Sequence, residues 1–138
     1  QLFQTMRELK LTYSDAEQLY RRMVFNVLAR NCDDHTKNVA FRLKKDGKWE
    51  LAPAYDICHA YQPNHQWVSQ HALSINGKRS HITREDLLVI GKSIKHKKAA
   101  ETIDEISTTV SNWKRFADDV KVIPNIRDEI NKTLIKLS

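Results

Sequence analysis

One stretch of eight residues, 31–38, gathers side chains that can carry out acid–base and metal chemistry. It reads Asn-Cys-Asp-Asp-His-Thr-Lys-Asn, and therefore holds two adjacent carboxylates, a histidine, a lysine and two carboxamides. Such a cluster is costly to bury, because each ionised group needs a partner that offsets its lost hydration. On a loop at the end of a rigid helix, the same groups can bind a cation and a phosphate.

The spacing within this stretch matches a known catalytic loop. Asp33 and Asn38 are five residues apart, as in protein kinases, where the Asp accepts the proton of the substrate hydroxyl and the Asn binds magnesium. Asp56 follows a short predicted hairpin, in the place of the kinase Asp-Phe-Gly aspartate, which also binds magnesium. Because Mg²⁺ usually keeps several waters, one carboxylate, one carboxamide oxygen and phosphate oxygens suffice. We therefore predict Asp33 as the catalytic base, and Asn38 and Asp56 as ligands of a magnesium ion bound with ATP.

Two motifs together resemble a known family. Asn-x-Asp-Asp-His-x-Lys-Asn at 31–38, followed by Leu-Ala-Pro-Ala-Tyr-Asp-Ile at 51–57, resembles the C-terminal region of the HipA family. Leu-Ser-Ile-Asn-Gly-Lys at 73–78 and Ile-Thr-Arg-Glu-Asp-Leu-Leu at 82–88 are similar to the segment that follows in that family. The resemblance covers about residues 21–94, and more loosely the rest of the chain.

The resemblance implies an activity and partners. HipA proteins are bacterial serine/threonine kinases that act as toxins in type II toxin–antitoxin systems, so the resemblance implies transfer of the ATP γ-phosphate to a protein hydroxyl with Mg²⁺. It implies a translation-linked substrate, such as an aminoacyl-tRNA synthetase. It also implies a HipB-like DNA-binding antitoxin, through which contact with DNA would be indirect.

The remaining side chains of the loop have more than one interpretation. Protein kinases place a Lys two residues after the catalytic Asp, whereas His35 occupies that position here. Lys37 can neutralise charge on the transferred phosphoryl group, so we include both as catalytic candidates and leave their division of labour open. Asp34 is interpreted as a neighbour that steers His35 or Lys37. The structural alternatives are that Asp33 or Asp34 caps the end of the helix, that Asp56 forms an Asx-turn, and that Lys37 is an ordinary surface lysine.

A helix is predicted directly before the loop, over residues 15–29. Ser14 and Glu17 have the spacing of a capping box. Seven apolar residues then recur at the three-to-four spacing of one buried stripe: Ala16, Leu19, Tyr20, Met23, Val24, Val27 and Leu28. We expect this helix to hold the loop rigidly, because a metal-and-base site tolerates little looseness.

A hairpin is predicted directly after the loop. Strands 39–43 and 48–52 alternate in polarity, and the Asp-Gly pair at 46–47 favours a hairpin turn in which both residues take positive φ. Because Asn38 precedes the first strand and Asp56 follows the second, the hairpin is expected to bring these two residues together.

The rest of the chain is predicted to be mainly helical. We expect an irregular segment over 57–70, a short strand over 73–75, a helix over 84–94 capped by Thr83, a long helix over 97–120 and a last helix that begins near Pro124. The fold class is therefore α+β, mainly α with one small β-hairpin. The resemblance implies the C-terminal lobe of a protein-kinase-like fold of the HipA type.

The glycines bear on whether the chain is complete as a kinase. Its 138 residues suffice for one domain with its own core, but the chain starts with Gln and its three glycines are isolated. A working kinase needs a glycine-rich loop and a strand lysine that grip the phosphates. We therefore expect residues 1–138 to form a single domain, a C-terminal catalytic-lobe fragment without the nucleotide-gripping N-terminal half, and to be inactive alone.

Composition bears on location and on an alternative function. No apolar run approaches the roughly 20 residues that cross a membrane, and the two cysteines form no Cys-x-x-Cys pair, so we expect a cytoplasmic protein with no membrane partner. The net charge is +6, with lysines densest over 92–98. Dispersed lysines keep a helical protein soluble, but a basic surface also favours acidic partners. The alternative function is a non-catalytic, kinase-like helical module that binds an antitoxin or nucleic acid.

Overall fold

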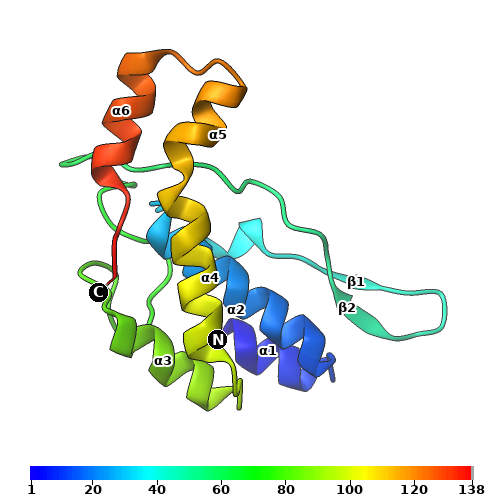
Figure 1. Ribbon diagram of the computed structural model, residues 1–138. Coiled ribbons are helices and arrows are strands. Elements are labelled where there is room, and N and C mark those ends of the chain that lie inside the picture. Colours follow the sequence, from blue (N-terminus) through cyan, green and yellow to red (C-terminus); the bar gives the residue numbers. More distant parts are fainter. Residues whose placement is uncertain (138) are drawn as a thin grey trace.

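The structure, a computed structural model, describes residues 1–137 of the chain. Within these residues, six α-helices form the body of the protein, and a two-stranded antiparallel sheet projects from it (Figure 1). The elements are α1 (Leu2–Glu8), α2 (Tyr13–Leu28), the 3-10 helix η1 (Thr36–Asn38), β1 (Phe41–Leu43), β2 (Trp49–Leu51), α3 (Arg84–Ser93), α4 (Ala99–Ser111), α5 (Trp113–Asp119) and α6 (Pro124–Thr133). The predicted α+β class is confirmed. None of the helices in the described residues is both long and apolar enough to cross a membrane.

Helix α2 begins earlier than predicted. Its N-cap is Thr12, whose hydroxyl accepts a hydrogen bond from the Asp15 amide, while the Asp15 carboxylate accepts one from the Thr12 amide. The predicted capping box of Ser14 and Glu17 is therefore wrong, because both residues lie inside the helix. Glu17 instead pairs with the buried His96, 3.0 Å away.

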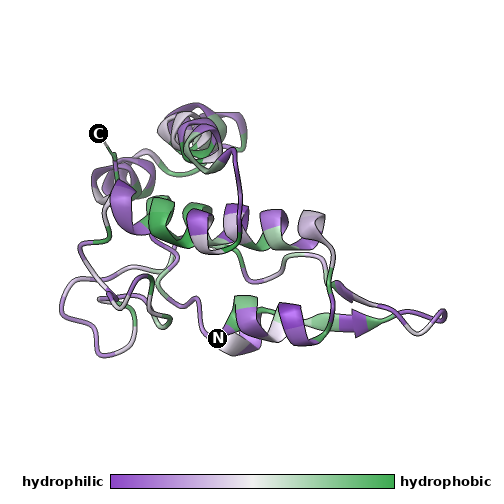
Figure 2. Ribbon diagram, turned by 90° about the horizontal axis from the view of Figure 1, so that it is seen from below, coloured by the Kyte–Doolittle hydropathy of each residue, from purple (hydrophilic) through white to green (hydrophobic). Residues whose placement is uncertain are grey.

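The core lies on two sides of α2. The larger cluster joins α2 to α3 and α4, and a smaller one joins α2 to α1 and the hairpin. In Figure 2, which is coloured by hydropathy, hydrophobic and hydrophilic residues alternate along the helices. The buried residues of the larger cluster are Tyr20, Val24, Val27, Leu28, Ile75, Ile82, Leu87, Ala99, Ile103, Ile106 and Val110, and those of the smaller are Met6, Leu19 and Leu51. Burial on both sides fixes the position of the C-terminal end of α2, from which the loop departs.

A glycine allows α3 and α4 to approach each other. A Cβ on Gly91 would lie 2.5 Å from the Ala99 Cβ and 3.3 Å from the Tyr20 hydroxyl oxygen. That hydroxyl donates to the Leu87 carbonyl, so it cannot move without losing a buried hydrogen bond. The close contact requires glycine at this helical position.

Gly91→Ala is expected to lower the free energy of unfolding by about 1–3 kcal/mol, the usual cost of overpacking. This loss outweighs the gain of about 1 kcal/mol that Ala has over Gly in a helix interior. Urea denaturation measures it, with Ser93→Ala, an exposed change in the same helix, as the control. A Gly91→Ala protein more stable than the parent would show that α3 and α4 do not touch here.

The hairpin is shorter than predicted and its turn is of a different kind. The strands pair Phe41 with Leu51 and Leu43 with Trp49. Of the predicted turn pair, only Gly47 takes a positive φ, +78°; the Gly47 amide donates to the Lys44 carbonyl at 2.9 Å. The extra loop residues explain the difference, because a two-residue turn requires positive φ at both positions, whereas this longer loop requires it at one.

Two further predictions are wrong. No strand forms over 73–75 within the described residues, where Ile75 makes only an isolated bridge with Lys78 across a turn in which Asn76 and Gly77 take positive φ. The long helix over 97–120 is broken at Asn112, which ends α4 and precedes α5. The break allows α5 to pack beside α6 (Figure 1).

The predicted cap at the start of α3 is confirmed and carries a charge network. The Asp86 carboxylate accepts hydrogen bonds from the Thr83 amide, the Asn76 side-chain amide and the Lys78 amine, each at 2.8 Å. These bonds, led by that from Lys78, hold the pKa of Asp86 well below its usual value of 3.8.

This lowered pKa predicts an acid dependence of stability. Because folding favours the ionised carboxylate, the stabilisation is complete above the ordinary carboxyl pKa and is lost as the pH falls toward the lower folded pKa. We expect the free energy of unfolding, measured by urea titration, to fall less steeply between about pH 5 and 2 in Asp86→Asn than in the parent. Identical pH profiles would contradict the network.

Candidate active site

The loop 31–38 leaves α2 and is fixed to the core by its own backbone. Arg30 takes a positive φ of 56°, which turns the chain out of the helix. The Cys32 amide then donates to the Ala60 carbonyl at 3.0 Å. Burial alternates from Cys32 onward: Cys32 and Asp34 are buried, whereas Asp33 between them is exposed. The loop therefore presents the side chain of Asp33 outward on an anchored backbone.

Asp33 and Asn38 are joined directly. The Asn38 side-chain amide donates to the Asp33 backbone carbonyl at 2.9 Å, which orients the carboxamide. The Asp33 carboxylate is 52% exposed and lies 3.7 Å from His35 Nε2. Within residues 1–137, it accepts no backbone hydrogen bond, so it does not cap α2. The carboxylate is open to a substrate.

Two hydrogen bonds bring the segment of Asp56 to this loop. The Tyr55 hydroxyl donates to the Lys37 carbonyl at 2.6 Å, and the Asn31 side-chain amide donates to the Asp56 carbonyl at 3.2 Å. Asp56 itself takes a positive φ of 50°, which is uncommon for a residue other than glycine. In the part of the chain that the structure describes, the Asp56 carboxylate makes no hydrogen bond, so no Asx-turn forms there.

The donor set around this loop suits magnesium. No three side chains of His, Cys, Asp or Glu among residues 1–137 gather into a metal site, so the protein ligands would be few. Mg²⁺ accepts this arrangement, because it commonly binds one or two carboxylates together with waters and substrate phosphates. The oriented carboxamide of Asn38 and the exposed carboxylate of Asp56 supply oxygen ligands of the right kind.

A comparison with protein-family models matched residues 1–113 to the HipA-like C-terminal domain. The chain belongs to this family. No curated protein and no solved structure matched the chain. The match confirms the resemblance read from the motifs and identifies a HipA-like, toxin-related module from a family associated with kinase toxins.

The catalytic candidates His35 and Lys37 occupy different surroundings in this HipA-like domain. His35 is 41% exposed, and its Nδ1 is buried without a hydrogen-bond partner among the described residues. Lys37 is exposed, and across residues 1–137 its amine makes no ion pair. The Lys37 amine is therefore available to an anionic ligand.

Asp34 does not steer His35 or Lys37, contrary to the prediction. Its carboxylate is buried, and it accepts a hydrogen bond from Nδ1 of the equally buried His71 at 3.0 Å. The sequence gives no signal for this pair, because the two residues are 37 positions apart and no spacing rule links them.

The neighbouring thiol is not a nucleophile. Burial raises the pKa of Cys32 to about 11, so the thiol stays protonated at neutral pH, and only a thiolate reacts readily. Cys32 is a small packing residue at the base of the loop.

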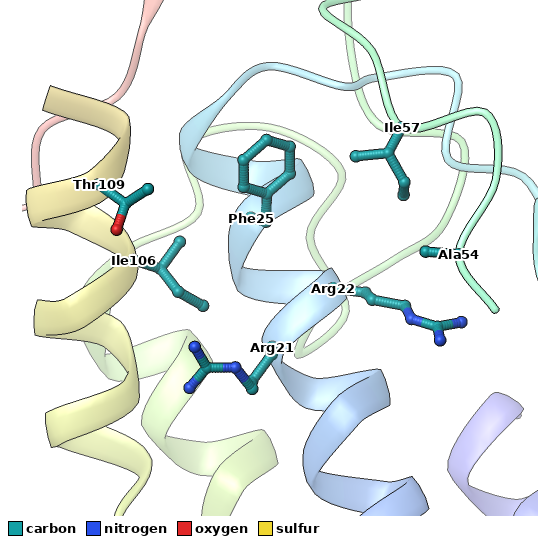
Figure 3. A pocket seen from close by; sticks show the side chains of 7 residues that line it. All are labelled: Arg21, Arg22, Phe25, Ala54, Ile57, Ile106 and Thr109. Carbon is teal, nitrogen blue, oxygen red and sulfur yellow. The ribbon is translucent and has the colours of Figure 1, made fainter. Parts of the chain in front are cut away.

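A pocket of about 250 Å³ adjoins the segment of Asp56 (Figure 3). It lies between α2, α4 and residues 54–57, and is lined by Arg21, Arg22, Phe25, Ala54, Ile57, Ile106 and Thr109. Both guanidinium groups at its edge are already engaged: that of Arg21 with Glu105 and that of Arg22 with the Ala52 carbonyl. The surface beside the proposed metal ligand is therefore mainly apolar.

Proposed function

We propose that this HipA-like domain forms the catalytic lobe of a serine/threonine protein kinase that transfers the ATP γ-phosphate to a protein hydroxyl. The observation that carries the proposal is the set of hydrogen bonds within the loop 31–38 and between this loop and the segment of Asp56. Asn38 is bonded to Asp33, and the segment of Asp56 is bonded to the same loop at two points. The two segments that carry these three oxygen-bearing side chains, the loop 31–38 and the segment of Asp56, are thus hydrogen-bonded to each other.

Each residue has a defined part in this reaction. The substrate hydroxyl oxygen forms a bond to the γ-phosphorus, the bond from that phosphorus to the β–γ bridging oxygen of ATP breaks, and ADP leaves. Asp33 accepts the hydroxyl proton. Asn38 and Asp56 would hold magnesium, which would supply positive charge to neutralise that of the ATP phosphates. The exposed Lys37 amine contacts a phosphoryl oxygen, and His35 lies beside Asp33, with Nε2 3.7 Å from the carboxylate.

The proposal extends to location and partners, on the support of family membership alone. The protein acts in the cytoplasm on a translation-linked protein such as an aminoacyl-tRNA synthetase. A HipB-like antitoxin binds and inhibits the protein, and contact with DNA is indirect, through this antitoxin.

The function is tested by measuring phosphotransfer with the full-length protein that the gene encodes. The protein is incubated with ATP labelled in the γ-phosphate and a set of purified aminoacyl-tRNA synthetases, with and without Mg²⁺. We expect magnesium-dependent label on serine or threonine, and only weak ATP binding by residues 1–138 alone. Absence of both labelling and magnesium-dependent ATP binding in the gene-encoded protein would overturn the proposal.

A second candidate function is binding to nucleic acid or an acidic partner without catalysis. It is favoured by four lysines around the turn between α3 and α4, namely Lys92, Lys95, Lys97 and Lys98, which are exposed and make no ion pair within residues 1–137. Their replacement by Gln should abolish the binding of duplex DNA and its steep decline between about 50 and 200 mM salt. Phosphotransfer that survives Asp33→Asn, with toxicity intact, would favour this function over the first.

A further inference from the structure

We propose that Asp34 and His71 are positioning residues, which hold the catalytic loop through one buried hydrogen bond so that Asp33 faces the substrate. The inference rests on the proposed function for its catalytic consequence. Its structural part, that this bond orders the loop, rests on the hydrogen bonds of Asp34 and His71 alone.

Asp34 is the most strongly tied residue of the loop. The residue is 6% exposed, and its carboxylate accepts three hydrogen bonds. They come from His71 Nδ1 at 3.0 Å, the Ala72 amide at 2.8 Å and the Leu73 amide at 3.3 Å. Because Asp34 points into the protein, the adjacent Asp33 points out of it.

His71 is itself held in place. It is 2% exposed, its amide donates to the Arg79 carbonyl at 2.8 Å, and its carbonyl accepts from Arg79 Nε at 2.6 Å. The Cys32 carbonyl also accepts from the Ala72 amide at 3.1 Å. The loop is therefore hydrogen-bonded to the segment 71–72, which is itself held by two hydrogen bonds with Arg79.

Loss of the His71 side chain would act on Asp33 through Asp34. The carboxylate oxygen that His71 contacts has no other donor among the described residues, whereas the other oxygen keeps the Ala72 and Leu73 amides. A buried carboxylate oxygen without a donor is strongly unfavourable, so Asp34 would turn toward water. The peptide group between Asp33 and Asp34 would turn with it, and the bond from Asn38 to the Asp33 carbonyl would be strained or broken. Both the base and one proposed magnesium ligand would then leave their positions.

A second histidine provides a matched control. His96 is 7% exposed, lies 3.0 Å from the Glu17 carboxylate through Nδ1 and bonds the Thr102 hydroxyl through Nε2 at 2.9 Å. It contacts Glu17 in the first half of α2, and the loop follows the C-terminal end of that helix, roughly 16 Å further along the helix axis. Its removal costs a similar buried contact without touching the loop.

The test compares His71→Ala with His96→Ala in the gene-encoded protein by two measurements, hydrogen exchange of the peptide 31–38 and steady-state phosphotransfer. We expect His71→Ala to speed exchange of the loop amides roughly 10-fold and to lower kcat about 10²-fold, the usual cost of a misplaced catalytic group. The magnesium concentration at half-maximal rate should rise as well, because Asn38 is displaced together with Asp33. His71→Asn, whose side-chain amide can replace Nδ1 as the donor, should bring both measurements most of the way back to the parent values. His96→Ala should lower the melting temperature but change neither readout.

Loop exchange and kcat that change equally in the two alanine variants would overturn the inference. If the parent protein has no phosphotransfer activity, the proposed function fails, and the exchange comparison alone decides the positioning role. If His71→Ala does not fold, His71→Leu and His96→Leu, which keep more of the side-chain volume but have no donor, replace the two variants with the same expected contrast.

Discussion

Asp33→Asn is expected to lower kcat for phosphotransfer about 10²–10⁴-fold, the range that general-base catalysis contributes. The carboxamide keeps the shape of the side chain but cannot accept the hydroxyl proton. KM for ATP should change little, because Asp33 contacts the acceptor and not the nucleotide. Steady-state kinetics with labelled ATP measure both constants in the gene-encoded protein.

The control for this variant is Asp46→Asn, an exposed carboxylate in the hairpin loop, which should leave kcat unchanged. The melting temperature of Asp33→Asn should also stay near that of the parent, because the carboxylate is half exposed and makes no backbone hydrogen bond within residues 1–137. A kcat within a few-fold of the parent value would remove Asp33 from the mechanism.

Asp56→Ala is expected to lower kcat/KM on the order of 10³-fold, because the charge stabilisation supplied by a bound metal is worth several kcal/mol. Its signature is a higher magnesium concentration at half-maximal rate, which a damaged acceptor site would not produce. Asn38→Ala should shift the magnesium dependence in the same direction. The double variant should lose less than the product of the two single losses, since both residues serve one ion.

Asp119→Asn, an exposed change on α5, is the matched control for the magnesium titration. Variants at positions 38 and 56 with additive effects, or with an unchanged magnesium dependence, would mean that these residues do not share a metal ion.

The elements that hold the loop were predictable because their signals are local. The apolar stripe of α2, the cap of Thr83 on α3 and the Asn-Gly turn before it depend on residues within a few positions of one another. The hairpin was predictable for the same reason, and it explains why Asp56 returns to the loop. The five-residue spacing of Asp33 and Asn38 likewise corresponds to a direct hydrogen bond.

The errors have a common physical cause. In each case the local sequence allows two alternative structures, and contacts between residues far apart in the chain decide which one forms. Thr12 and Ser14 both precede an acidic residue by three positions. Thr12 forms the cap with Asp15, while Glu17 pairs with His96, a residue far away in the sequence. The break at Asn112 has no strong local signal, since α4 and α5 are helical on either side. Beyond the break, α5 packs on α6, which lies later in the chain.

The segment beyond the matched family region also supports the loop, a contact that no spacing rule anticipates. The Thr133 carbonyl accepts from Arg30 Nε at 3.0 Å, and its hydroxyl bonds His59 Nε2 at 2.8 Å. The Ile135 amide donates to the Leu28 carbonyl at 2.9 Å. The end of α2 and the start of the loop are thus fastened to the C-terminal part of the chain.

Electron–nuclear double resonance of bound Mn²⁺ tests the central claim most directly. Mn²⁺ replaces Mg²⁺ with a non-hydrolysable ATP analogue on gene-encoded protein whose Asp and Asn side chains carry carbon-13. We predict carbon-13 couplings from one carboxylate and one carboxamide, the first lost in Asp56→Ala and the second in Asn38→Ala. Mn²⁺ held by nucleotide and water alone, with no carbon-13 coupling from the protein, would contradict the magnesium site and the kinase role built on it.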